Sequence, residues 1–165
     1  MKIENKVRDP VCEMDVSSGN YDSNYLGVDY SFCSKQCHDR FVTNPHLYIG
    51  KPGHPSPKQL GQSVIKCRTM KLDRAIPEDI SEKLDTALST MMGIRDITFE
   101  DNVIRITYDL LEATVEQIED EILKTDKSLS LSWMEKIRSA FIHYVEETEI
   151  MNLEEDTPDN HCNKL

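Results

Sequence analysis

The sequence has no long apolar run, no excess of positive charge and no even set of cysteines. No stretch approaches the roughly 18 apolar residues that cross a bilayer, and the N-terminus lacks the apolar core of a signal peptide. The formal net charge of −11 disfavours binding to a phosphate backbone. We therefore expect a cytoplasmic protein with no membrane insertion and no nucleic-acid partner.

Motifs of the common enzyme classes are also missing from the sequence. There is no glycine-rich phosphate loop, no nucleophile elbow and no HExxH pair. A redox thiol mechanism favours a CxxC pair with a lowered pKa, and the CxxxC spacing found here fits that mechanism poorly. We therefore expect the protein not to be an enzyme.

Cysteine is the residue type whose placement carries chemistry. Five cysteines make an odd count for a secreted disulfide framework, and in a reducing cytosol thiols stay free for metal or redox chemistry. Cys12, Cys33 and Cys37 share one short segment with the spacing C-x20-C-x3-C. Thiolates at this spacing suit a soft cation such as Cu(I), or borderline Zn(II). The alternatives are three buried, inert thiols or a purely structural zinc.

Changes of composition divide the chain into segments. Residues 50–62 combine three prolines with three glycines and continue neither a strand nor a helix. Before them, alternation across residues 25–33 predicts a hairpin with Gly27 at its turn, and residues 35–44 predict a short helix. A long helical stripe from Met134 to Val145 and an acidic tail without periodicity end the chain.

The segment after residue 62 follows a regular order of elements. Strands are predicted at 64–70, 97–99, 104–108 and 129–133. A helix is predicted after Pro77, and a second one behind a capping box formed by Thr114 and Gln117. The resulting βαββαβ order is that of ferredoxin-like folds, so we predict the α+β class.

The first segment resembles the YHS domain. The matching stretches are DPVCEMDV at residues 9–16, YSFCSKQC at 30–37, Phe41 and NPHLY at 44–48. That family is related to the TRASH modules found with bacterial copper and heavy-metal transporters and regulators. The resemblance implies a small treble-clef-like, zinc-finger-derived fold that binds heavy metal through Cys12, Cys33 and Cys37. Glu13 departs from the family, which usually has glycine after the first cysteine.

A fourth ligand is the open question of this site. Related zinc-finger modules begin with CxxC, and Asp9 stands at the position of that first cysteine. His38 and Met14 are other candidates, and we rank Asp9 above His38 as the fourth ligand. A carboxylate would complete a tetrahedral site, whereas three thiolates alone suit trigonal Cu(I) or Ag(I).

The second segment resembles the heavy-metal-associated domain of copper chaperones and metal-pumping ATPases, in element order and length over residues 63–133. In that family the first loop carries a metal-binding CxxC, and here residues 70–76 have no cysteine. We therefore predict a degenerate domain without a metal loop. Cys67, which lies within a predicted strand, is expected in the core.

These inferences define four segments and two functional hypotheses. The segments are a YHS-type module at 1–49, a linker at 50–62, a ferredoxin-like domain with a C-terminal helix at 63–149, and a disordered acidic tail at 150–165. The first hypothesis is metal sequestration, sensing or delivery, with copper(I) or zinc as the ion and a metal-transporting ATPase or another metal-handling protein as partner. The alternative is a structural zinc module beside a ferredoxin-like protein-interaction domain.

Overall fold

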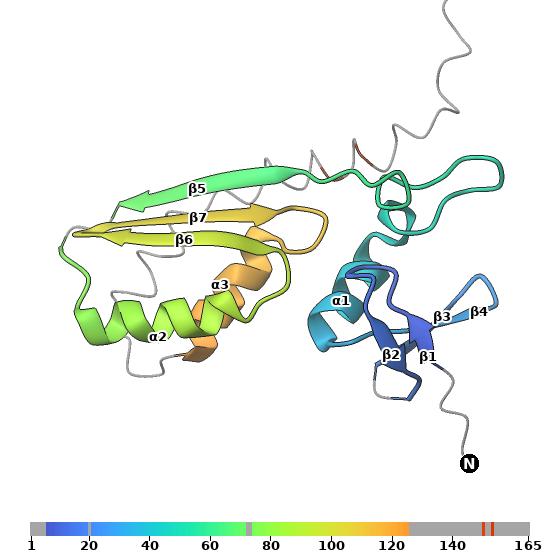
Figure 1. Ribbon diagram of the computed structural model, residues 1–165, viewed down its shortest axis with the longest axis horizontal. Coiled ribbons are helices and arrows are strands. Elements are labelled where there is room, and N and C mark those ends of the chain that lie inside the picture. Colours follow the sequence, from blue (N-terminus) through green and yellow to red (C-terminus); the bar gives the residue numbers. More distant parts are fainter. Residues whose placement is uncertain (1–5, 20, 72–73, 126–149, 151–152, 154–165) are drawn as a thin grey trace, which may run out of the picture. The chain divides into compact units, whose positions relative to one another are not determined.

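The chain divides into two compact units, with the boundary between Ser63 and Val64. A computed structural model describes residues 6–19, 21–71, 74–125, 150 and 153. Both units combine short antiparallel strands with helices (Figure 1), which confirms the predicted α+β class. Each unit is described by itself.

The first unit consists of two hairpins followed by helices. Strands β1 (Lys6–Arg8) and β2 (Asp15–Ser17) form the first hairpin, which the sequence pattern did not reveal. Strands β3 (Asp22–Tyr25) and β4 (Val28–Ser31) form the predicted one. The loop residues Leu26 and Gly27 have φ of 52° and 80°, as a two-residue turn that matches strand twist requires. Helix α1 (Lys35–Thr43) and the 3-10 turn η1 (Pro45–Leu47) follow.

Phe41 of α1 is the centre of an aromatic core in this unit. Its ring centroid lies 4.8 Å from that of Tyr30 and 5.1 Å from that of Phe32. Tyr25 and Tyr48 complete the cluster at 6.0 and 6.2 Å. Aromatic rings bury large apolar areas and favour tilted or edge contacts at these distances. The unit therefore has an aromatic core around Phe41, and Cys37 of the same helix is buried with it.

The predicted linker at residues 50–62 is an ordered part of the first unit. Gln59 Oε1 accepts hydrogen bonds from the backbone N–H groups of Gly50 and Ser56, at 3.1 and 2.8 Å. The Lys58 N–H donates to the Leu47 carbonyl at 3.0 Å, and Ser56 is fully buried. The prolines and glycines form turns, as expected, and these turns fold back on the chain because Gln59 satisfies their backbone donors.

The second unit follows the predicted order through its fifth element. Figure 1 shows helices α2 and α3 on one face of a three-stranded antiparallel sheet with the order β5-β7-β6. The predicted strand 129–133 and helix 134–145 lie outside the described residues, so the six-element ferredoxin-like topology stays a prediction. The bounds are β5 (Ile65–Lys71), α2 (Glu78–Ser89), β6 (Ile94–Glu100), β7 (Val103–Asp109) and α3 (Val115–Thr125).

Local sequence signals explain where both helices of this unit begin. Pro77 caps α2, and Glu78 and Asp79 occupy its first turn near the positive helix end. The predicted capping box of α3 is confirmed. The Thr114 N–H donates to Gln117 Oε1 at 3.2 Å, and the Gln117 N–H donates back to Thr114 Oγ1 at 3.3 Å. Each residue thus satisfies a backbone donor of the other.

The prediction that Cys67 lies in the core is wrong. Cys67 is exposed, whereas Met70 of the same strand is buried. Directly paired residues share a face of a sheet; Met70 pairs with the buried Ile104, and Cys67 pairs with Thr107 on the opposite face. The alternation of β5 therefore places its thiol on the face away from the buried residues.

Two residues of the predicted acidic tail are described. Ile150 is helical and buried, and Leu153 is helical and partly buried. The disorder of the tail as a whole stays a prediction. The other tail residues lie outside the described part of the chain.

A buried carboxylate closes the sheet unit. Asp109, at the end of β7, is 1% exposed. Its Oδ1 accepts from the N–H groups of Val64 and Leu111, both at 3.1 Å, and its Oδ2 accepts from Arg95 at 3.2 Å. The backbone bonds join the entry to β5 with the loop after β7.

Replacing Asp109 should destabilise the second unit far more than replacing its ionic partner. Asp109→Ala leaves two backbone donors unsatisfied, and we expect a loss of about 3 kcal/mol in the free energy of unfolding. Arg95 is half exposed, so Arg95→Ala should cost no more than about 1 kcal/mol. Urea denaturation of the two variants checks this order; equal losses would show that the ion pair carries the stability.

Candidate metal centre

A tight loop between β1 and β2 presents the first cysteine. The Asp9 N–H donates to the Met14 carbonyl at 2.9 Å, and the Glu13 N–H donates to the Asp9 carbonyl at 2.8 Å. These bonds close residues 9–14 into a knuckle that carries Cys12. Glu13 has φ of 65°, a conformation that costs a residue with a Cβ about 1–2 kcal/mol. Glycine at this position would adopt the same φ without that cost.

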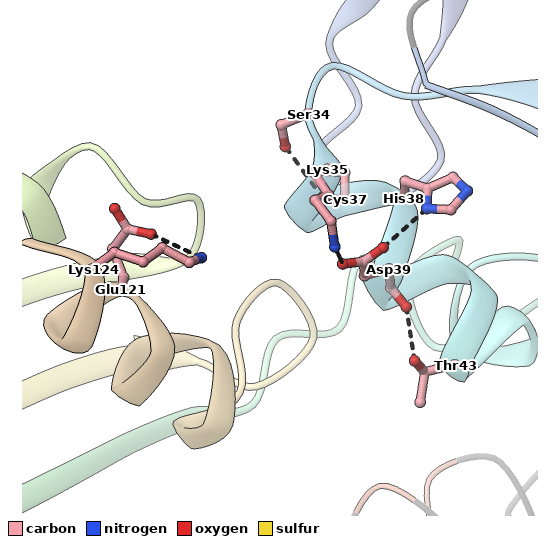
Figure 2. Close-up of polar contacts among 8 residues, drawn as sticks. All are labelled: Ser34, Lys35, Cys37, His38, Asp39, Thr43, Glu121 and Lys124. Carbon is pink, nitrogen blue, oxygen red and sulfur yellow. Dashed lines mark hydrogen bonds and ion pairs between the residues drawn. The ribbon is translucent and has the colours of Figure 1, made fainter.

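The start of helix α1 presents the other two cysteines. Ser34 caps this helix, and its Oγ accepts from the Cys37 N–H at 3.3 Å (Figure 2). Cys33 lies just before the cap and Cys37 is the third helical residue, so their thiols lie one turn apart on the same side. The positive end of the helix favours negative charge at these thiols. A short serine-capped helix therefore places two sulfurs beside the knuckle.

The structure brings together all four side chains that the sequence predicted as ligands. The ligand atoms of Asp9, Cys12, Cys33 and Cys37 all lie within 4.8 Å of one another. The Cys33 sulfur is 3.5 Å from each of the other two sulfurs. A Zn–S bond of about 2.3 Å would separate tetrahedral sulfurs by about 3.8 Å. The cluster is thus close to the size that one metal ion needs.

Burial differs among the three thiols. Cys37 is fully buried, whereas Cys12 and Cys33 are each partly exposed. An ion held there would thus lie between one buried cysteine and two that solvent partly reaches.

Asp9 is fully buried, and its carboxylate is bonded to backbone on both sides of the cluster. Its Oδ1 accepts from the N–H groups of Val11 at 2.8 Å and Cys12 at 3.4 Å. Its Oδ2 accepts from the N–H of Cys33 at 2.8 Å. Asp9 was selected from the sequence as a ligand, and its bond to Cys33 was missed because no local pattern indicates a contact between residues 24 positions apart.

The two other candidates for the fourth ligand have different surroundings. His38 Nδ1 is 3.0 Å from Asp39 Oδ1 (Figure 2). The His38 ring also makes a T-shaped contact with Phe32, at 5.6 Å between ring centroids. Burial raises the pKa of Asp39, but hydrogen bonds from Lys35 and His38 outweigh it and lower the pKa overall. Met14 is 51% exposed. Asp9, by contrast, is fully buried, and its ligand atom lies within 4.8 Å of all three sulfurs.

The thiols differ in how readily they lose a proton. A hydrogen bond from Cys37 is the main reason that the pKa of Cys12 falls to about 7, against the effect of burial. Burial raises the pKa of Cys33 to about 11. The hydrogen bond to Cys12, together with burial, raises the pKa of Cys37 far above its usual range. Without metal, Cys12 is thus the thiol closest to ionisation at neutral pH.

A family model of the YHS domain matches residues 7–51. The match covers somewhat more than a quarter of the chain and includes all four clustered residues. No curated protein and no solved structure matched the chain. The match and the cluster together indicate a metal-binding role for the first unit. The resemblance of the second unit to heavy-metal-associated domains stays a prediction.

No helix in the described part of the chain combines the length and apolar content needed to span a bilayer.

Metal binding should release protons and strengthen as the pH rises. Between pH 7 and 11 an ion displaces protons from Cys33 and Cys37, and below pH 7 it displaces a third from Cys12. We expect the apparent affinity to rise about 100-fold per pH unit near pH 8, and more steeply below pH 7. Calorimetric titration in buffers of different ionisation enthalpy counts the protons. An affinity unchanged from pH 6 to 9 would contradict this linkage.

Relieving the strained backbone at Glu13 should stabilise the first unit. Glu13→Gly removes the Cβ that disfavours a φ of 65°, and we expect a gain of about 1 kcal/mol. The lost ion pair with Arg8, at 3.5 Å between exposed side chains, contributes little. Glu13→Ala is the matched control, because it removes the same charge and keeps the strain. Thermal unfolding of both variants checks this, and an equal gain in both would assign the effect to charge.

Proposed function

We propose that the protein binds one soft metal ion as cargo, for sequestration, sensing or delivery. Copper(I), silver(I) and zinc(II) are the candidate ions, and Cys12, Cys33 and Cys37 are the residues that hold it. The observation that carries the proposal is the pairing of one buried thiol with two that reach the surface. Structural zinc sites are closed by four protein ligands, whereas a site that exchanges its ion needs access for an incoming ligand, which the partly exposed Cys12 and Cys33 offer.

Thiolate exchange is the mechanism that this arrangement favours. A thiolate of the partner approaches past the partly exposed cysteines and forms a bond to the ion, while the bond from Cys12 or Cys33 breaks and the released thiolate takes up a proton. The remaining bonds are then replaced in turn, with Cys37 last because it is the most buried. No oxidation or reduction is needed, so we propose a carrier and not an enzyme.

The aromatic core of the first unit supports a cargo role over a structural one. Phe41 is buried among four other rings. Domains that need zinc to fold have little apolar core of their own and unfold when the metal is removed. Here the aromatic rings around Phe41 provide packing besides that at the thiols, so we propose that loading and unloading occur on a folded protein.

We assign the second unit the task of docking a partner. We propose that this unit has the six-element ferredoxin-like topology of heavy-metal-associated domains. The observed strand order β5-β7-β6 is consistent with that topology. Among its described residues no group of ligand atoms gathers as in the first unit. A metal-transporting ATPase or another metal-handling protein in the cytoplasm is the proposed partner.

Metal content of serine variants tests the cargo proposal. We expect the reduced full chain to bind one equivalent of Cu(I) or Ag(I), and Cys37→Ser to lose more than about 100-fold in affinity, since even outer-shell changes cost 10- to 100-fold. Cys67→Ser is the matched control, because it removes an exposed thiol of the second unit. Elemental analysis gives the number of bound ions, and competition with a chelator of known affinity gives the affinity of each variant.

The folded state after metal removal separates cargo from structural zinc. We expect circular dichroism and the thermal transition of the chelated protein to show an intact first unit. Tightly held zinc whose removal unfolds that unit would contradict the cargo role and favour the structural alternative. Absence of any bound metal under reducing conditions would contradict both.

A further inference from the structure

Asp9 has the contacts of a structural clamp. Its carboxylate is completely buried, and a buried charge needs hydrogen-bond partners. The three backbone N–H groups of Val11, Cys12 and Cys33 supply them. A carboxylate offers about four acceptor positions. Three are therefore occupied by the protein itself, including both positions on Oδ1.

The clamp joins the two parts of the chain that carry the sulfurs. Oδ1 holds the knuckle through Val11 and Cys12, and Oδ2 holds the approach to α1 through Cys33. The backbone of Cys12 and that of Cys33 are thus bound to one carboxylate. This common anchor accounts for the 3.5 Å between the Cys12 and Cys33 sulfurs. Asp9 sets the spacing of the thiols before any ion arrives.

We propose that Asp9 is a positioning residue and not a metal ligand, so the site coordinates its ion through three sulfurs alone. This inference rests on the proposed binding of a soft metal. An ion bound to Oδ1 would displace the N–H of Val11 or Cys12 and leave that buried donor unpaired, which is costly. An ion on Oδ2 would share the atom that holds Cys33 in place. Oδ2 keeps one acceptor position, but an ion there would draw charge from the bond to Cys33, so ligation by Asp9 would weaken a contact that positions the thiols.

Three-sulfur coordination selects a class of cargo. Monovalent d10 ions such as Cu(I) and Ag(I) accept three soft thiolates in a trigonal arrangement, whereas zinc sites almost always have four ligands. Zinc bound here would need water as its fourth ligand. We therefore assign the site to monovalent soft ions.

X-ray absorption spectroscopy of the Ag(I)- or Cu(I)-loaded full chain counts the ligands directly. We expect three sulfur neighbours and no oxygen neighbour in the wild-type protein and in Asp9→Asn. Zinc-loaded wild-type protein should likewise show three sulfurs, with water as the oxygen neighbour that completes the site. An oxygen at about 2.0–2.2 Å that disappears in Asp9→Asn would identify Asp9 as a ligand and overturn the inference.

Affinity and amide exchange test the clamp itself. Asn cannot accept a hydrogen bond through its NH2 group, so Asp9→Asn loses a bond to the knuckle or to Cys33. We expect about a 10- to 100-fold loss of affinity for Ag(I) and Zn(II) alike, and faster hydrogen exchange at Val11 and Cys33 in the metal-free protein. Asp15→Asn, an exposed neighbour with the same charge change, should alter neither.

The outcomes separate this inference from the proposed function. If Asp9→Asn lowers the affinity for Zn(II) but not for Ag(I), the clamp is overturned. The same holds if this variant changes neither metal affinity nor the rates of amide hydrogen exchange. In both cases the proposed metal binding is unaffected. If the wild-type protein binds no soft metal, the proposed function fails, while the exchange rates at Cys33 still decide whether Asp9 holds the two segments. If Asp9→Asn does not fold, the wild-type spectra alone determine the ligand count.

Discussion

The hydrogen bonds of the buried Asp9 carboxylate hold the first unit's site in shape. The knuckle that carries Cys12 and the helix start that carries Cys33 and Cys37 belong to different hairpin and helix elements. Short strands of three or four residues give these elements little rigidity of their own. A charge that must be satisfied away from water provides that rigidity, because its donors cannot leave without a large loss in free energy.

The second unit contains the same device at a different place. Asp109 accepts from the N–H groups of Val64 and Leu111, which join the entry and exit of the sheet, as Asp9 joins knuckle and helix. Both units are small, and small units bury too little apolar surface to fix every loop by packing. A buried carboxylate that accepts several backbone N–H groups fixes a loop with one side chain. The two carboxylates differ in their surroundings. Among the described residues, Asp9 lies beside three thiols and Asp109 does not.

Features set by neighbours in sequence were predictable here. The turn at Gly27, the helix after Pro77 and the capping box of Thr114 and Gln117 follow from residues within three positions of each other. The cysteine spacing likewise indicated the cluster. The N-cap at Ser34 was overlooked although serine before a helix is a known signal.

Features set by distant contacts were not predictable. Cys67 was placed in the core because free cysteine is usually buried, but the register of β5 against β7 decided its face. The ordering of residues 50–62 depends on Gln59, whose amide has no local pattern to mark it. The bond from Cys33 to Asp9 likewise required the folded hairpins. Sequence reasoning therefore found the chemical groups of the site and left open how they are held.

The rings packed around Phe41 bear on how such a protein changes over generations. If the first unit holds a metal ion as proposed, a substitution at the partly exposed Cys12 or Cys33 alters the ligands and leaves those rings in place. A substitution at the buried Cys37 alters the ligands and the core together. Selection on ion preference therefore has more room at Cys12 and Cys33 than at Cys37, and a duplicated copy of this unit would diverge first at those two positions.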